Sequence, residues 1–306
     1  MSRRGLALFV AMGVIWGIPY LLIKVAVRQV SPVDLVFFRT TIGAVLLVPV
    51  AVARGDLRPA LRRWLPIVAY TTLEMGVPWV LLSTAEQRLP SSLSGLLIAA
   101  VPLVGVPIGL LLGRRDVVHR RGMVGLLVGL GGVAALLGFD IGAGQVGSVA
   151  LVAVVVVGYA AGPAVADRWL GDVPVLGVVA SSLLLCAAAY APFALTDLPR
   201  RMDGAVTASV LTLGVVCTAV AFVLFFALIA EIGAVRATVI TYLNPAVAVV
   251  LGVAFLGERF GVATGVGFAL ILAGSWLGTR HGPVPEVAEV APASGPQELL
   301  DRTPEG

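Results

Sequence analysis

The 306-residue chain is 59% hydrophobic and 12% charged, with a mean hydropathy of +1.02. Soluble domains are about 45–50% apolar and about 25% charged, so this composition excludes a soluble globular protein. The formal charge of +4 does not indicate nucleic-acid binding, because the basic residues are divided among loops instead of forming one patch with aromatic residues.

A helix that crosses the hydrocarbon layer of a bilayer needs about 20 mostly apolar residues. Ten such stretches follow one another along the chain, and the third contains Glu74 and Pro78. The first begins at Leu6 and runs on without a small-residue cleavage pattern, so we interpret it as a membrane span and not as a signal peptide. We therefore predict an all-α polytopic membrane protein with ten transmembrane helices. The predicted spans are residues 6–26, 32–53, 64–83, 92–113, 121–139, 146–166, 174–195, 206–229, 235–256 and 261–279.

The loops between these spans differ in charge. If the N-terminus is inside, the outer loops receive only Arg28, Arg88, Arg200, Arg201 and Arg259, and the other arginines outside the spans lie on the inner side. An excess of basic residues marks cytoplasmic loops, so we predict that both termini are cytoplasmic. The preference for Arg over Lys and the abundance of Ala, Val, Leu and Gly are typical of a GC-rich bacterial genome, which predicts the bacterial cytoplasmic (inner) membrane.

The residues that usually hold metals or cofactors are scarce. Cys186 and Cys217 both lie inside predicted spans, where a cysteine acts as a small hydrophobe. His119 and His281 are the two histidines, and neither lies in a span, so a histidine-ligated zinc site or an intramembrane Ser-His hydrolase lacks its parts. We predict no metal site and no cofactor. Residues 281–306 are rich in Pro, Glu and Ala, which predicts a disordered cytoplasmic tail.

Two parts of the chain are alike. Residues 125–138 and 265–278 have the same length and begin and end with Gly, and each follows a span in which a proline lies at a similar offset, Pro102 and Pro245. We interpret this as a duplication of a unit of five spans. An odd number of spans reverses the second copy in the membrane, as in the inverted repeats of many secondary transporters. The predicted repeats are residues 1–140 and 146–280.

Several segments resemble one family of transporters. They are WGIPYLLIK at 16–24, SPVDLVFFRTTIGAVLL at 31–47, the proline-bearing fourth span, and TYLNPAVAVVLGVAFLGERF at 241–260. Together they resemble the EamA-type transporters of the drug/metabolite transporter superfamily, over residues 6–279. The resemblance implies ten helices in two inverted five-helix repeats, and export of metabolites, amino acids or drugs. A small-molecule substrate and the lipid bilayer are thus the expected partners, and a homodimer stays open.

The chain departs from the family at the end of its fourth span. The family commonly has a Glu there that matches Glu258, whereas this chain reads GRRD and places Arg115 or Asp116 in that position. The two repeats are therefore not expected to use a matching pair of acids at the ends of their fourth spans. Glu258 and Arg259 are expected to end the ninth span as an exposed ion pair of little energetic weight.

Ionisable side chains within a bilayer are costly and usually face a cavity or a partner. Arg39, in the second span, can bind an anionic substrate group through its guanidinium, or it can pair with backbone carbonyls or Asp34. Glu74, near the middle of the third span, is a candidate for proton coupling or for a cationic substrate; the alternative is a permanent ion pair with Arg39. Lys24 is expected to reach the headgroups from the outer end of the first span.

Aromatic residues in or near the ends of spans are candidates for lining a substrate pocket, although packing or an interfacial belt is the alternative for each of them. Asn244 precedes Pro245, where a break in the helix can expose carbonyls to a ligand, and a simple kink is the alternative. The aromatic candidates are Trp16, Tyr20, Trp79, Tyr159 and Tyr242.

These observations favour a secondary transporter that exports a small organic molecule by alternating access. Exchange of this molecule for protons is one form that the mechanism can take. An uncoupled facilitator or channel of the same fold is the alternative, and a coupling role for Glu74 distinguishes the two. A pump driven by nucleotide hydrolysis is disfavoured because Lys24, the single lysine, follows no Gly-rich loop. A membrane-embedded enzyme or a structural scaffold is also disfavoured, so the chain is not expected to be an enzyme.

Overall fold

The structure is a computed structural model that describes residues 2–111, 120–140, 143–196, 198–199, 201–233, 240–259 and 261–279. All regular elements in these residues are helices. The predicted tail, residues 281–306, and Arg115 with Asp116 lie outside the described residues.

The helices follow the predicted spans closely, although several spans consist of more than one element. A span divides where proline or an irregular turn interrupts the helix, as between α1 and α2, where Pro19 begins the second helix. The elements of the first half are α1 (Arg3–Gly17), α2 (Pro19–Ala26), α3 (Pro32–Ala53), α4 (Leu57–Arg62), α5 (Trp64–Thr71), η1 (Thr72–Gly76), α6 (Val77–Glu86), α7 (Ser91–Ile98), α8 (Val101–Leu111) and α9 (Arg120–Asp140). Those of the second half are η3 (Ala143–Gln145), α10 (Val146–Trp169), α11 (Val175–Ala194), α12 (Gly204–Gly214), η4 (Val215–Val220), α13 (Ala221–Ile232), α15 (Ile240–Leu256) and α16 (Val262–Thr279).

Seven segments of the described chain are long and apolar enough to cross a membrane. Three shorter apolar helices, Met123–Ala135, Leu243–Leu256 and Thr264–Gly274, correspond to the fifth, ninth and tenth predicted spans. The polytopic all-helical architecture is therefore confirmed, and the count of ten spans stays a prediction. The seven segments are Arg3–Ala26, Pro32–Ala53, Trp64–Glu86, Ser91–Leu111, Val146–Trp169, Val175–Ala194 and Gly204–Ile232.

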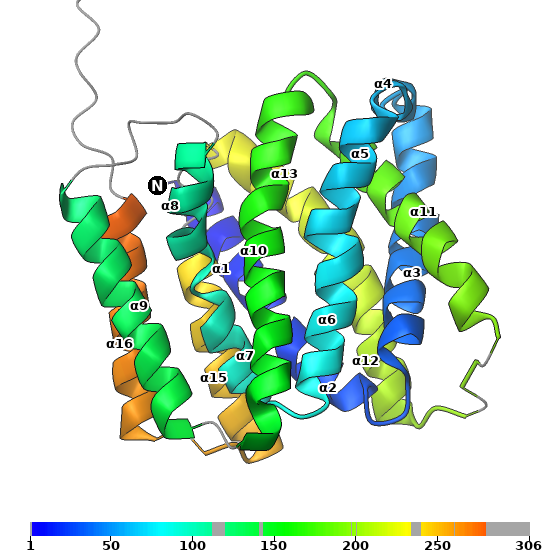
Figure 1. Cartoon of the computed structure of the whole chain (residues 1–306). Coiled ribbons are helices and arrows are strands. Elements are labelled where there is room, and N and C mark those ends of the chain that lie inside the picture. The colour runs from blue at the N-terminus through cyan, green and yellow to red at the C-terminus, as the bar shows by residue number, and fades with distance from the viewer. Residues whose placement is uncertain are drawn as a thin grey trace, which may run out of the picture.

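The helices lie side by side in one bundle, and their connections gather at its two ends (Figure 1). The N-terminus lies at the same end as α4, whereas α10, the first helix of the second half, starts at the opposite end (Figure 1). We name these ends the N-terminal end and the far end. The N-terminal end carries the basic α4 segment, where Arg63 forms an ion pair with Asp172 at 2.8 Å.

Contacts between the halves repeat in a regular way. In the first half α1 packs against α13 and α15, and in the second half α10 packs against α6 and α8. The remaining main contacts join α3 to α11, α7 to α15 and α9 to α16. In each half, the first span therefore packs against the third and fourth spans of the other half.

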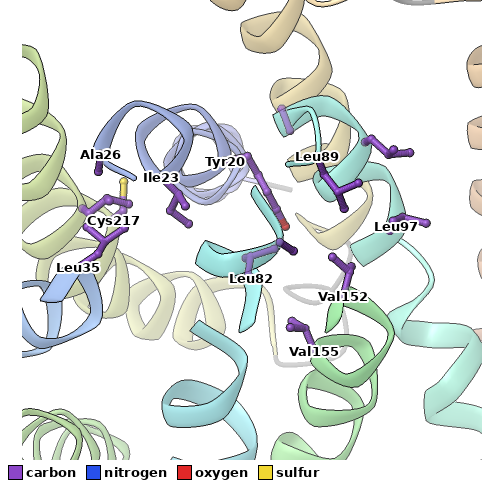
Figure 2. Packing of buried hydrophobic residues seen from close by; sticks show 14 of the residues in the cluster. Tyr20, Ile23, Ala26, Leu35, Leu82, Leu89, Leu97, Val152, Val155 and Cys217 are labelled. Carbon is purple, nitrogen blue, oxygen red and sulfur yellow. The ribbon is translucent and has the colours of Figure 1, made fainter. Parts of the chain in front are cut away.

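The largest buried cluster draws on both halves. Figure 2 shows Tyr20 and Ile23 from α2 close to Leu82 from α6, Val152 from α10 and Cys217 from η4. Since this cluster joins elements of both halves that are distant in sequence, it holds the two halves together. A second cluster, around Trp79, adjoins it through Tyr159.

Glycines allow α9 and α16 to approach closely. A Cβ atom at Gly132 would lie 2.7 Å from the Gly267 carbonyl oxygen and the Ile271 amide nitrogen. Those are backbone atoms, which cannot rotate away. In lipid, such close packing replaces the missing hydrophobic force between helices. The adjacent Gly131 faces open space, with nothing within 4 Å of a Cβ atom.

These two neighbours provide a matched pair of variants. We predict that Gly132→Ala destabilises the protein by about 1–3 kcal/mol, because the added carbon overpacks a tight contact. Gly131→Ala should leave stability unchanged or raise it by up to about 1 kcal/mol, since alanine is the better helix former. Thermal unfolding of both purified variants in detergent measures the difference. Equal melting temperatures would contradict the close approach of α9 and α16.

The start of α12 is fixed by Asp203, which lies outside the membrane-spanning segment. Its carboxylate accepts a hydrogen bond from the Val206 amide at 2.8 Å and another from the Gln29 side chain at 2.6 Å. The Val206 N–H, with Gln29 assisting, holds the pKa of Asp203 below its ordinary value of 3.8. This residue therefore joins the loop after α2 to the start of the eighth span.

A lowered pKa makes the stabilisation by Asp203 depend on pH. The contribution is complete above the unfolded value of 3.8 and is lost as the pH falls through the lower folded value. We predict that Asp203→Ala lowers the melting temperature at pH 7 and that the deficit disappears in strong acid. Melting curves across this range test it, with Asp172→Ala as the control for an exposed ion pair. A deficit that does not change with pH would contradict this account.

Candidate substrate site

The third span of each half contains one turn of π-helix, which the sequence analysis did not predict. The first is η1, between α5 and α6, and the second is η4, between α12 and α13. Such turns disturb the regular hydrogen bonding of the helix and are frequent at functional sites. Hydroxyl groups compensate here: Tyr190 Oη donates to the Gly76 carbonyl at 3.1 Å, and Thr218 Oγ1 donates to the Leu213 carbonyl at 2.8 Å.

Arg39 lies between the second of these turns, η4, and helix α6. Its side chain is buried in α3, and its Nε donates to Thr218 Oγ1 in η4 at 2.9 Å. The guanidinium carbon lies 3.6 Å from the ring centroid of Trp79, which is within cation–π range. The terminal nitrogens of Arg39 make no hydrogen bond to the part of the chain that the structure describes. Arg39 is thus held by one hydrogen bond and one aromatic ring, and its terminal N–H groups are available to donate hydrogen bonds to a ligand.

Two tyrosines surround this cation. Tyr20 from α2 and Tyr159 from α10 both lie within electrostatic range of the guanidinium. Tyr159 also approaches Trp79 and packs against both central clusters. Four of the predicted site residues, Tyr20, Arg39, Trp79 and Tyr159, therefore lie in one region of the bundle.

Glu74 lies in η1, against α10. A Cβ atom at Gly162 would clash with the Glu74 carboxylate, so the bare glycine backbone makes room for this side chain. Glu74 Oε2 is buried without a hydrogen-bond partner, and Tyr70 and Tyr159 are within electrostatic range. Among the described residues no ion pair within 4.0 Å joins Arg39 to Glu74 or to Asp34. The alternative of a permanent Arg39–Glu74 pair is therefore not observed.

The other predicted site residues lie elsewhere or are not described. Trp16 packs against Phe225 at 4.7 Å and Phe222 at 6.1 Å, between ring centroids, in the contact between α1 and α13. Asn244 donates through its amide, in the orientation that satisfies its neighbours, to Gly13 and Ile240 carbonyls at 3.1 and 3.0 Å. This contact joins α15 to α1 and favours a packing role. Tyr242 lies in α15, but its side chain is outside the described part of the chain.

A polar cluster at the far end of the bundle differs from the sequence-based expectations. Lys24 does not extend to the headgroups: its Nζ donates to the Glu86 and Leu89 carbonyls, at 2.6 and 2.8 Å, because these are free at the end of α6. Glu258 does not form an exposed pair with Arg259. Its carboxylate accepts hydrogen bonds from the backbone amides of Ser91 and Ser92 at the start of α7, at 2.6 and 2.9 Å.

A pocket of about 240 Å³ opens at this far end, away from Arg39. We regard Arg39 and its neighbours as the candidate substrate site, because Arg39 keeps unused donors there and the Glu74 carboxylate has a buried oxygen without a partner. The pocket is lined by Lys24, Arg28, Arg88, Pro90, Gln145, Leu256 and Glu258.

Comparison with known proteins identifies the class. The model of the EamA-like transporter family matches residues 3–138 and again residues 147–280. The "Uncharacterized inner membrane transporter YedA" of Escherichia coli strain K12 is 28% identical over 258 residues, which is 82% of each chain, and the proteins of that name from strains O6:H1 and O157:H7 match equally. One solved crystal structure, 23% identical, covers 91% of this chain and 97% of its own with a TM-score of 0.65, which shows the fold alone.

The helical bundle and these matches define a polytopic membrane transporter. The chain belongs to the EamA-like transporter family, and the family resemblance predicted from the sequence is confirmed.

The anchoring of Arg39 can be tested through stability. We predict that Thr218→Val lowers stability by about 1–3 kcal/mol, because it leaves the buried Nε of Arg39 and the Leu213 carbonyl without partners. Thr84→Val is the matched control, since its hydroxyl bonds only the Val80 carbonyl of its own helix. Melting temperatures in detergent compare the two. A larger loss in Thr84→Val would contradict the role of Thr218.

Proposed function

We propose that this protein is a secondary transporter that exports a small organic molecule across the bacterial cytoplasmic membrane and couples export to proton entry. The observation that carries the proposal is a fixed cation with unused donors, Arg39, and an acid with a buried, unpartnered oxygen, Glu74, both within electrostatic range of Tyr159. A purely structural bundle has no use for unsatisfied ionisable groups, because burying them is costly.

Binding follows from the same groups. The guanidinium of Arg39 offers a planar set of donors for a carboxylate or a similar anionic group, while Trp79 holds its plane. Tyr20 and Tyr159 add amphipathic rings that suit the body of an organic molecule. A metabolite, an amino acid or a drug fits this set of groups.

Alternating access is supported by how the halves are arranged. The first helix of each half packs against the other half, and these two helices start at opposite ends of the bundle (Figure 1). That arrangement is the one expected of inverted repeats, in which one unit rocks against the other around a central site. We infer that η1 and η4 are the points at which the third span of each half bends.

The orientation rests on charge. The N-terminal end carries the basic residues of α4 and the loops beside it, so we place this end and both termini in the cytoplasm. The relatives named as inner membrane transporters support the bacterial inner membrane as the location.

The direct test is flux through the purified protein in liposomes. Pools of amino acids and of cationic drugs are screened with and without an imposed pH gradient, beside Glu74→Gln. We expect gradient-driven flux that the variant loses, because glutamine cannot bind and release a proton. Flux that is the same with and without the gradient, and the same in the wild type and in Glu74→Gln, would identify an uncoupled facilitator and contradict the coupling role of Glu74.

The space around Glu74 gives a second test. We predict that Gly162→Ala reduces gradient-driven flux several-fold, since the added Cβ displaces the Glu74 carboxylate. Gly147→Ala, on the same helix but facing open space, should transport like the wild type. Initial rates in liposomes, corrected for the amount of folded protein, make the comparison. Equal rates would show that the position of Glu74 is unimportant.

A further inference from the structure

Glu86 is a second buried acid, and the sequence analysis did not single it out. It is the last residue of α6, at the far end of the bundle, and its exposed fraction is 0%. Both of its carboxylate oxygens are buried without a hydrogen-bond partner. Its backbone carbonyl, in contrast, accepts a hydrogen bond from the Lys24 ammonium at 2.6 Å. The backbone at this helix end therefore has a partner, whereas the side-chain carboxyl group has none.

The charged and titratable groups around Glu86 come from every neighbouring element. Lys24 and Tyr20 approach from α2, Tyr159 from α10, and Glu258 from the segment after α15. Lys24 donates to two backbone carbonyls, and no ion pair within 4.0 Å joins it to the Glu86 carboxylate in the described chain. Arg28, which also lines the pocket, repels the positive charge of Lys24.

Glu258 also disfavours a second negative charge here. Both of its carboxyl oxygens already accept hydrogen bonds from the amides of Ser91 and Ser92 at the start of α7. A negative charge on Glu86 is therefore costly, because its carboxyl group is buried without a donor, beside a second acid and a lysine that is already bonded to backbone carbonyls.

We propose that Glu86 is a proton-binding site at the far end of the bundle, separate from Glu74, which releases its proton when that end opens. The inference rests on the proposed transport function. Lys24 and Glu258, the charged neighbours of Glu86, both line the pocket of about 240 Å³ that opens there. The pocket therefore brings water to two of the charged neighbours of Glu86.

The release step needs no other reactant. As α6 and α7 separate from α2 and from the segment that holds Glu258, two sets of hydrogen bonds break: those of Lys24 to the Glu86 and Leu89 carbonyls, and those of Glu258 to the Ser91 and Ser92 amides. The O–H bond of Glu86 then breaks, its proton passes to water in the pocket, and the carboxylate keeps the electron pair. The freed ammonium of Lys24 balances the new charge. Closure of this end requires the reverse, in which Glu86 takes up one proton from the same compartment.

Infrared spectroscopy of the purified full-length protein tests the protonation state without any substrate. The C=O stretch of a protonated carboxylic acid is recorded at neutral pH in water and in D₂O for the wild type, Glu86→Gln, Glu74→Gln and Glu231→Gln. Glu231, an exposed residue at the end of α13, is the control. We expect Glu86→Gln to remove one component of the acid band, and Glu231→Gln to remove none.

An acid band that is the same in the wild type and in folded Glu86→Gln would show that Glu86 is ionised, and would overturn the proposal. If Glu86→Gln does not fold, Glu86→Asp serves instead: it should shift one component of the band, and a band without a shift overturns the proposal. Because no flux is measured, a failure of the proposed transport function leaves this result unaffected.

Discussion

Every polar group inside a helical bundle in lipid must find its partner within the protein, because the hydrocarbon offers none. Most groups of this chain meet that requirement: Thr218 bonds both Arg39 and a free carbonyl, and Lys24 bonds two carbonyls at the end of α6. Against this background Glu74 and Glu86 are exceptions, with buried carboxylate oxygens that have no partner. An exception of this kind is costly, and a proton that is bound and released in turn gives a physical reason for it.

The two acids lie at different levels of the same helix, and their surroundings differ accordingly. Glu74 is placed by a π-turn and by the bare backbone of Gly162, within electrostatic range of Tyr159, which is in turn within range of Arg39. Glu86 is placed by a helix end, next to the hydrogen bonds that join α2 and the segment after α15 to the ends of α6 and α7. In the mechanism we propose, a substrate binds near Glu74, while Glu86 responds to the opening of the far end. This separation allows binding and opening to be linked through protons without direct contact between the two sites.

Much of this arrangement could be predicted from the sequence. Hydrophobic length gave the polytopic class, family motifs indicated the EamA resemblance, and charge at membrane depth identified Arg39 and Glu74 as unusual. The π-turns could not be predicted, because they shift hydrogen bonds by one residue and leave the hydrophobic pattern intact. Glu86 and Glu258 were missed or misread for another reason: both lie at span ends, where an acid is usually solvated. Only the packing of α7 and α2 against them makes one acid a helix cap and leaves the other buried.

The central claim is that protonation of these acids sets which end of the bundle is open. The most direct measurement is the distance distribution between spin labels at Gln87 and Arg259, exposed residues on the two sides of the Glu258 contact. The labels are attached to cysteines in a background without the buried Cys186 and Cys217. The account predicts a short distance at low pH, a growing long-distance population as the pH rises, and no such response when both acids are replaced by glutamine. A distance distribution that stays the same at every pH, in the labelled protein with both acids present, would contradict this account.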